Sequence, residues 1–235
     1  MSNSTMPTLT PREGYRLWAS SYDRELNALV ALEERCLKPM LPSLASKDVV
    51  DLACGTGRWL QYLLSGGVRF AVGIDFSDEM LAQAARRTQL RSGLVCGDCL
   101  RVPLRSSSAD LVLCSLALSH LQDLGAFARE VERIARPGAD VFITDICPDA
   151  RMRGWRVTFR HDDEVCEIRN QHFTLEFILL TLGQAGLRLV SLEQPGFSEW
   201  EYPIFVARGK ERLYEQAIGA PAILICHFRA DWVKA

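Results

Sequence analysis

Short apolar runs alternate with amphipathic stretches through the middle of the chain. The runs have the length of buried β-strands and are rich in Val, Ile, Leu and Cys; they cover residues 48–54, 69–76, 92–98, 109–118 and 139–147. The stretches between them carry apolar residues three and four positions apart, which predicts helices over residues 58–67, 77–87 and 124–138. Strands that alternate with helices predict right-handed βαβ units, and therefore a parallel sheet that helices cover on both faces.

The pattern changes toward both ends of the chain. Residues 1–10 are polar and rich in Ser and Thr, so we expect them to be disordered. From Pro11 to about Cys36, aromatic and aliphatic residues recur at helical spacing, which predicts a long N-terminal helix. The elements predicted after residue 147 are a hairpin, a helix and two final antiparallel strands, over residues 155–173, 174–186, 187–197 and 221–230.

Composition places this sequence among ordinary globular proteins. It has 235 residues, of which 48% are hydrophobic and 24% charged, and a formal net charge of -2. That charge argues against a nucleic acid as the main partner, because phosphate contacts need a basic surface. No apolar run reaches the roughly 20 residues that span a membrane. The first residues also lack the basic and apolar regions of a signal peptide, so we expect a cytoplasmic protein without a membrane span.

The eight cysteines are scattered along the chain. Most of them lie in strand-like runs, where a cytoplasmic protein uses cysteine as a small buried hydrophobic residue. Cys96 and Cys99 form the one close pair, and no second pair stands at the spacing of zinc ligands. We therefore predict no metal site.

The turn after the first strand, "VVDLACGTGRWL" over residues 49–60, places an aspartate before small residues that let a ligand approach the backbone. A nicotinamide dinucleotide is one candidate, because Asp75 ends the second strand 20 residues beyond Gly55. However, the third glycine of that fingerprint is replaced by Leu60, and the Asp51 carboxylate would repel a pyrophosphate. The same carboxylate suits S-adenosylmethionine, which carries an ammonium and a sulfonium group and no phosphate.

Five segments stand in a fixed order along the chain: "VVDLACGTGRWL", "VGIDFSDEML", "LVCGDCLRVPL", "ADLVLCSLALSHL" and "RPGADVFITDI". In order and spacing they resemble the successive motifs of class I S-adenosylmethionine-dependent methyltransferases, and most closely the ubiquinone- and menaquinone-type small-molecule branch. The resemblance covers roughly residues 45–147. The segment "YRLWASSYDRELNAL" resembles the N-terminal helix that many of these enzymes fold over the cofactor. One departure is Ala53, which stands where the family has its first glycine.

The resemblance implies a fold for the whole chain. It would be a single α/β domain over residues 1–235, with a Rossmann-like, seven-stranded, mostly parallel sheet, helices on both faces and an antiparallel edge strand. A lid helix within residues 11–40 and a small cap, the hairpin insertion at residues 148–205, would cover the acceptor site.

The resemblance also implies roles for residues of this sequence. Asp75 would bind the two ribose hydroxyls, Asp98 the adenine amino group, and Asp51 the methionine moiety. Met80 and Tyr22 suit the domain core equally well, and Tyr15 and Trp18 most simply form the buried stripe of the first helix. The other expected contacts with S-adenosylmethionine, or with its product S-adenosylhomocysteine, are Ala53, Cys54, Gly55, Thr56, Gly57, Phe76, Met80, Cys99, Ser115 and Tyr22.

Methyl transfer from a sulfonium needs alignment and exclusion of water more than activation, and a base helps only where the acceptor atom is protonated. Two histidines are candidates for such a base. His120 follows the fourth strand at the mouth of the cofactor site, and His172 lies at the start of the helix after the hairpin. His161 and His227 are better explained as a turn residue and a strand residue.

The segment over residues 148–205 is rich in aromatic residues, which favours a planar or apolar small-molecule acceptor. A small core under the hairpin explains the same residues equally well. Three other functions stay open beside a small-molecule methyltransferase. They are a tRNA-modifying methyltransferase, a non-catalytic S-adenosylmethionine-binding protein and a nicotinamide-dependent reductase.

Overall fold

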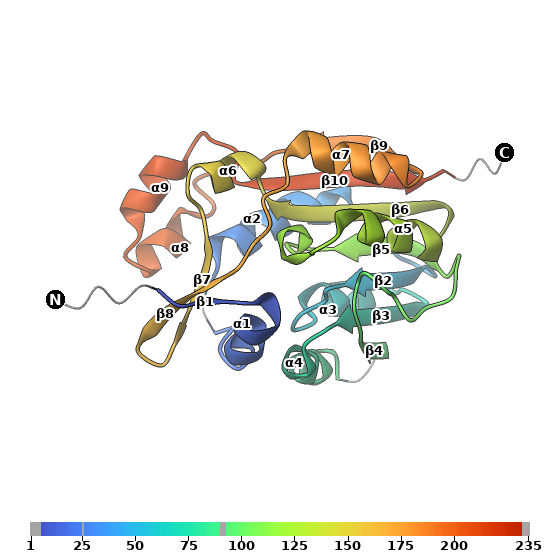
Figure 1. Ribbon diagram of the computed structural model, residues 1–235, viewed down its shortest axis with the longest axis horizontal. Coiled ribbons are helices and arrows are strands. Elements are labelled where there is room, and N and C mark those ends of the chain that lie inside the picture. Colours follow the sequence, from blue (N-terminus) through green and yellow to red (C-terminus); the bar gives the residue numbers. More distant parts are fainter. Residues whose placement is uncertain (1–5, 25, 90–92, 232–235) are drawn as a thin grey trace.

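The centre of the protein is a seven-stranded sheet in the order β4-β3-β2-β5-β6-β10-β9 (Figure 1). The structure is a computed structural model that describes residues 6–24, 26–89 and 93–231. Neighbouring strands are parallel from β4 to β6, whereas β10 runs antiparallel to both β6 and β9. The predicted antiparallel strand therefore lies one place inside the edge. The strands are β2 (Asp48–Leu52), β3 (Phe70–Asp75), β4 (Gly93–Cys96), β5 (Ala109–Cys114), β6 (Ala135–Ile146), β9 (Leu187–Glu193) and β10 (Ile223–Ala230).

Helices cover both faces of this sheet, as the alternating pattern predicts (Figure 1). On one face Phe127 and Ile178 join the buried side chains of β5, β6 and β10. On the other face Leu32 and Trp59 pack against the opposite side chains of the same strands. The helices concerned are α2 (Ala28–Leu37), α3 (Arg58–Ser65), α4 (Asp78–Thr88), α5 (Leu124–Ile134) and α7 (Leu175–Gln184).

The helix predicted over residues 124–138 ends earlier, at Ile134. Ala135 already has extended backbone angles and pairs with Ala109 at the start of β6. Pro137 and Gly138 therefore lie inside a long strand. The prediction placed the boundary at the proline, whereas pairing with β5 ends the helix three residues before it.

The predicted long N-terminal helix is two helices, α1 (Pro11–Trp18) and α2. The chain leaves the helical path after Trp18, and Asn27 starts α2 by accepting a hydrogen bond from the Leu29 amide at 3.0 Å. The expectation of disorder over residues 1–10 is wrong for Thr8–Leu9, which form the short strand β1. Residues 1–5 of the same range lie outside the described residues.

The predicted hairpin consists of β7 (Val157–His161) and β8 (Glu164–Ile168), with Asp162 at a φ of 51° in the turn. β1 adds to it as a parallel strand beside β8. Helix α1 contacts β7 and β8 on one side and α4 on the other (Figure 1). It therefore lies over the end of the sheet where the parallel strands finish. Three short helices were not predicted: α6 (Pro148–Met152), α8 (Tyr202–Ala207) and α9 (Glu211–Ala217). No helix in the described part of the chain has the length and apolar character needed to cross a membrane.

Candidate functional site

A cavity of about 660 Å³ lies between α1 and the carboxyl ends of β2, β3, β4 and β5. Each strand contributes a residue from the turn that follows it: Gly55 after β2, Phe76 after β3, Asp98 after β4 and Ser115 after β5. Tyr15 of α1 forms part of the outer wall. Open α/β sheets bind their ligands at this end of the strands, so the cavity is the candidate site.

Asp75 is the most strongly organised carboxylate of the cavity. One oxygen accepts the Gly55 amide at 2.9 Å, and the other accepts the Ser77 amide at 2.9 Å. The side chain is buried, and this burial raises its pKa against the opposing effect of the backbone hydrogen bonds. Because a carboxylate oxygen accepts more than one hydrogen bond, the fixed pair of oxygens remains able to accept a vicinal diol.

The turn after β2 follows a tight path with positive φ angles at Ala53 (55°), Gly55 (53°) and Gly57 (77°). Ala53 adopts the conformation that glycine adopts without strain, so the departure from the family pattern leaves the turn in place. Ala53 and Gly55, for which cofactor contacts are predicted, line the cavity. The Gly55 amide donates a hydrogen bond to the Asp75 carboxylate, and this bond connects the turn to the end of β3.

Three residues of the same turn face away from the cavity, although cofactor contacts were predicted for them. The Thr56 hydroxyl donates to Asp23 at 3.0 Å, and Cys54 packs in the core against Leu60. A Cβ on Gly57 would lie 3.0 Å from Ala84, so this glycine lets α3 approach α4. These residues shape the turn from behind and do not line the cavity.

Asp51 is buried beneath this turn, with neither carboxylate oxygen hydrogen-bonded within the described part of the chain. Burial raises its pKa well above the usual range; Arg58 opposes the shift, and the negative charges of Glu33 and Asp75 add to it. Asp51 is not among the residues that line the cavity. An unpaired buried carboxylate is costly, and a cationic group is the partner that would relieve the cost.

Glu33 of α2 is a site residue that the sequence analysis missed. Its buried carboxylate accepts hydrogen bonds from Arg58 at 2.5 Å, from Trp59 at 3.2 Å, from Ser115 at 2.7 Å and from Thr144. It thereby fixes the hydroxyl of Ser115, which lines the cavity. The available signal was that Glu33 directly follows the apolar run "ALVAL" at the start of this helix.

The predicted adenine and ribose contacts meet on one side of the cavity. Asp98 is exposed there, and one of its oxygens accepts the Leu100 amide at 2.8 Å. The other predicted residues that line the cavity are Phe76, Met80, Cys99, Ser115 and Tyr22. Thr10, Pro11 and Arg12 also line the cavity, although no contact was predicted for them.

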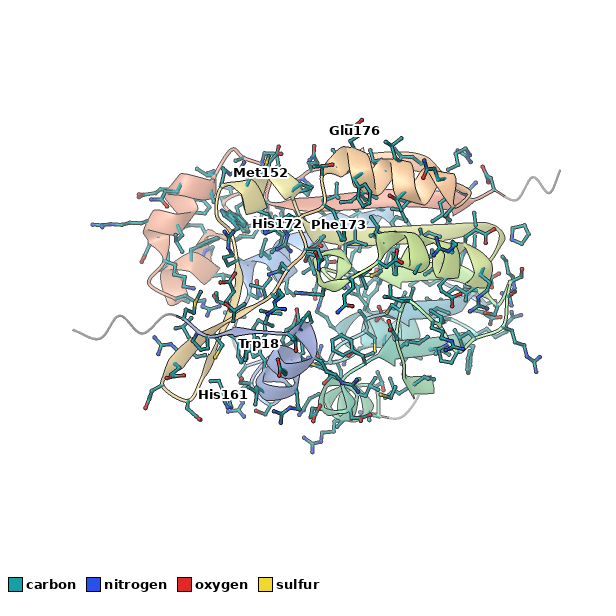
Figure 2. All side chains as sticks on the ribbon, in the orientation of Figure 1. Trp18, Met152, His161, His172, Phe173 and Glu176 are labelled. Atoms are coloured by element: carbon teal, nitrogen blue, oxygen red, sulfur yellow. The ribbon has the colours of Figure 1, made fainter. Side chains whose placement is uncertain are left out.

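The two candidate histidines differ in position. His120 lines the cavity, and its Nε2 lies 2.9 Å from the Tyr15 hydroxyl; burial lowers its pKa to about 4. His172 lies exposed on the segment that leads into α7, and it does not line the cavity (Figure 2). The structure thus brings His120 to the site and leaves His172 outside it.

The residues present fit the predicted cofactor. S-Adenosylmethionine combines a vicinal diol with a cationic aminoacyl end, and the cavity offers the organised Asp75 near the unpaired, buried Asp51. The two carboxylates belong to adjacent parallel strands, and Asp75 lies two residues beyond Gly73, the register partner of Asp51.

We expect Asp51→Asn to flatten the pH dependence of stability in the cofactor-free protein. The folded-state pKa is raised above its ordinary value of 3.8, so this group's stabilising contribution is complete below that pH and is lost as pH rises through the folded-state pKa. In that window the free energy of unfolding of the wild type should fall, relative to Asp51→Asn, by up to about 1.4 kcal/mol per pH unit. Urea unfolding at about pH 5 and about pH 8 measures the difference. Asp163→Asn, at the exposed hairpin turn, is the matched control, and equal pH dependence in all three proteins would contradict the assignment.

Comparison with known proteins adds three likenesses. Residues 50–143 match a family described as "Methyltransferase domain". A malonyl-[acyl-carrier protein] O-methyltransferase of Marinomonas sp. is 30% identical over 186 residues, which are 77% of this chain and 67% of that protein. A demethylmenaquinone methyltransferase of Staphylococcus saprophyticus is 31% identical, over 51% of this chain and 55% of its own length.

Solved structures share the fold. An S-adenosylmethionine-dependent methyltransferase from Listeria monocytogenes superimposes with a TM-score of 0.69 at 20% identity, over 85% of this chain and 98% of that one. Among the relatives compared by sequence, the chain spans two thirds of the length of the Marinomonas protein and about half of the length of the Staphylococcus protein.

Proposed function

This chain belongs to the class I S-adenosylmethionine-dependent methyltransferases, and we propose that it transfers the methyl group to a small-molecule acceptor bound beside Tyr15 and His120. The observation that carries the proposal is the Asp75 carboxylate. It is held by the Gly55 and Ser77 amides at the carboxyl end of β3, on the wall of a 660 Å³ cavity. This arrangement is the one that a ribose diol requires.

Each part of the cofactor has a proposed partner. Asp75 binds the ribose hydroxyls, while Asp98 and the Cys99 backbone bind the adenine edge. Ala53 and Gly55 let the methionine moiety approach the backbone, Ser115 binds near its ammonium group, and Asp51 supplies the compensating negative charge from below. Phe76, Met80 and Tyr22 supply apolar contacts. Cys54, Thr56 and Gly57 act by holding the turn.

When bound, the cofactor supplies a methyl group on a sulfonium, which is already activated toward a nucleophile. The chain's own contribution is then alignment and exclusion of water. Helix α1 is suited to both tasks, because it closes the cavity from outside. The capping box between Thr10 and Glu13 fixes its first turn at the rim, with the Thr10 amide 3.0 Å from the Glu13 carboxylate.

Of the two predicted candidates for a general base, His120 alone is kept in the proposal. The exposed side chain of His172 reaches the cavity neither directly nor through a hydrogen bond of the described residues. His120 is neutral at physiological pH, because burial lowers its pKa to about 4, so it is available to accept a proton. That same low pKa makes it a weak base toward an acceptor such as a phenol, whose pKa is about 10.

The acceptor is proposed as a small, planar or apolar molecule. The related proteins act, by their names, on malonyl-[acyl-carrier protein] and on demethylmenaquinone, and the aromatic rings of Tyr15 and Tyr22 line this cavity. A tRNA acceptor is less well supported, because the net charge is -2. We also propose a cytoplasmic location, since all eight cysteines are unpaired.

Formation of S-adenosylhomocysteine tests the proposal. The purified protein is incubated with S-adenosylmethionine and with matched carboxylic acids, phenols, hydroquinones and amines, and the product is measured by mass spectrometry. We expect at least one small acceptor to raise the product well above the acceptor-free level. Binding of the cofactor without product, with small acceptors and with bulk tRNA alike, would instead identify a non-catalytic binding protein. Formation of S-adenosylhomocysteine with tRNA but with none of the small acceptors would identify a tRNA-modifying methyltransferase.

A further inference from the structure

The Tyr15–His120 pair belongs to the part of the cavity wall that has no proposed contact with the cofactor. The two residues stand 105 positions apart in the chain, and their side chains meet with the Tyr15 hydroxyl 2.9 Å from His120 Nε2. Their rings pack edge to face, with centroids 5.2 Å apart. Burial raises the pKa of Tyr15 well above 10, so its hydroxyl remains protonated and able to donate a hydrogen bond.

The hairpin sets the position of Tyr15. The Tyr15 ring stacks on Trp18 at 5.9 Å, and Trp18 stacks on Phe159 of β7 at 5.1 Å. A Cβ on Gly14 would lie 2.7 Å from the Ile168 side chain, so α1 lies directly against β8. Figure 2 labels Trp18 on α1, the helix that contacts β7 and β8. Tyr15 therefore presents its hydroxyl to the cavity from a rigid aromatic stack.

The cavity holds few groups that remove protons. The charged or basic side chains among its described lining residues are Arg12, Asp75, Asp98 and His120. Asp75 and Asp98 are engaged by backbone amides at the cofactor end. The remaining titratable lining groups are phenols and thiols, and burial raises the pKa of Tyr15, Tyr22 and Cys99.

A buried ion pair behind His120 does not add to the groups that could remove a proton in the cavity. Arg151 of α6 and Asp145 of β6 are both buried and lie 3.0 Å apart, and each binds Ser119 next to His120. Their charges act in opposite directions on the pKa of His120 and of Tyr15. The pair therefore holds the His120 loop in place, and it supplies no net charge to the cavity.

We propose that Tyr15, held by His120, orients an acceptor whose nucleophile is a carboxylate oxygen and which reacts without losing a proton to the protein. With a proton on Nε2, the imidazole donates to the Tyr15 oxygen, and the phenolic hydrogen is left to donate to the acceptor. A carboxylate lone pair then forms the bond to the methyl carbon, and the electrons of the breaking carbon–sulfur bond pass to sulfur. The products are a neutral methyl ester and the thioether S-adenosylhomocysteine, and no proton moves.

The surroundings favour this reaction over methylation of a neutral amine. An anion and a sulfonium give two neutral products, whereas an amine and a sulfonium leave a cation behind. The rings of Tyr15 and Tyr22 line the cavity beside His120, so a transfer that removes charge is favoured there over one that retains it. In such a site a donated hydrogen bond to an anion is also strong, because the donor is desolvated and fixed in advance.

The inference rests on the proposed function, and a binding measurement separates the two. The protein is loaded with S-adenosylhomocysteine and titrated by calorimetry with benzoate and with straight-chain carboxylates from butyrate to decanoate. Each is paired with its primary amide and its amine. We expect at least one carboxylate to bind tenfold or more tightly than both its partners. If the protein binds S-adenosylhomocysteine but no carboxylate exceeds its amide, the inference is wrong while the proposed function stands; failure to bind S-adenosylhomocysteine overturns both.

Variants test the roles of the pair. Tyr15→Phe should weaken the preferred carboxylate about tenfold or more, with S-adenosylhomocysteine affinity changed less than twofold. Tyr214→Phe, which removes a phenolic hydroxyl from α9, should change neither affinity. His120→Gln retains a hydrogen-bonding side chain and should preserve carboxylate affinity better than His120→Phe. Equal loss in the two His120 variants would contradict the positioning role.

The pH profile distinguishes orientation from general base catalysis. With a carboxylate acceptor, kcat/KM should be flat from about pH 6 to about pH 9, because the acceptor is ionised throughout and no protein group accepts its proton. Tyr15→Phe should lower kcat/KM and leave the profile flat. Efficient methylation of an amine or a phenol with a His120-dependent pH profile would show that the protein supplies a base, contrary to the proposal.

Discussion

Replacing Asp75 with alanine should weaken the binding of S-adenosylmethionine at least tenfold, and by about a hundredfold if both ribose hydroxyls are lost as partners. The variant removes a charged acceptor of hydrogen bonds, each of which contributes about 1.5–3 kcal/mol to binding. It also leaves the Gly55 and Ser77 amides without their partner, so the turn after β2 loses the side-chain part of its link to β3. Isothermal titration of the wild type and of Asp75→Ala measures the change.

Asp163→Ala is the matched control for this titration. It removes an exposed carboxylate at the hairpin turn and should leave cofactor affinity within twofold of the wild type. S-Adenosylhomocysteine retained from expression would mask binding, so both proteins are first unfolded, dialysed and refolded, or exchanged exhaustively. Equal affinity in Asp75→Ala and the wild type would mean that the ribose lies elsewhere in the cavity. The cofactor contacts proposed above would then be wrong.

The second large effect is on stability, at Glu33. Glu33→Ala should lower the free energy of unfolding by about 2–4 kcal/mol, because it removes the acceptor of several buried donors and leaves the half-buried Arg58 with the partly exposed Glu34 as its carboxylate partner. The indole N–H of Trp59 and the hydroxyl of Thr144 lose the same acceptor. Urea unfolding followed by circular dichroism measures the change at neutral pH.

The neighbouring residue supplies the control. Glu34 lies on the same helix and binds Arg58 at 3.1 Å and Lys38 at 2.6 Å, but it is partly exposed. Glu34→Ala should therefore cost about 1 kcal/mol or less. If Glu33→Ala cost no more than Glu34→Ala, the buried hydrogen-bond cluster would not stabilise the protein, and Ser115 would have to be fixed by other contacts.

Local patterns in the sequence determined most of the fold. Strand-length apolar runs and the helical stretches between them predicted the order of elements from β2 to β6, because both signals depend on residues that are near in sequence. The positions of Asp75 and Asp98 at strand ends followed directly, since parallel strands of one sheet end on the same side. The missing third glycine and the charge of Asp51 then favoured a cationic cofactor over a pyrophosphate.

Only the tertiary structure decided which residues meet. In the sequence, Glu33 is one more polar residue of a helix. In the structure, Arg58, Ser115 and Thr144 from three other segments all donate hydrogen bonds to it. In the sequence, Tyr15 is part of a buried stripe. In the structure, the loop after β5 places His120 within hydrogen-bonding distance of its hydroxyl. Thr56 and Gly57 share a motif with Gly55, yet contacts with Asp23 and Ala84 turn them away from the cavity. Periodicity reports which face of an element is buried, whereas the partner on that face depends on how segments far apart in the chain pack together.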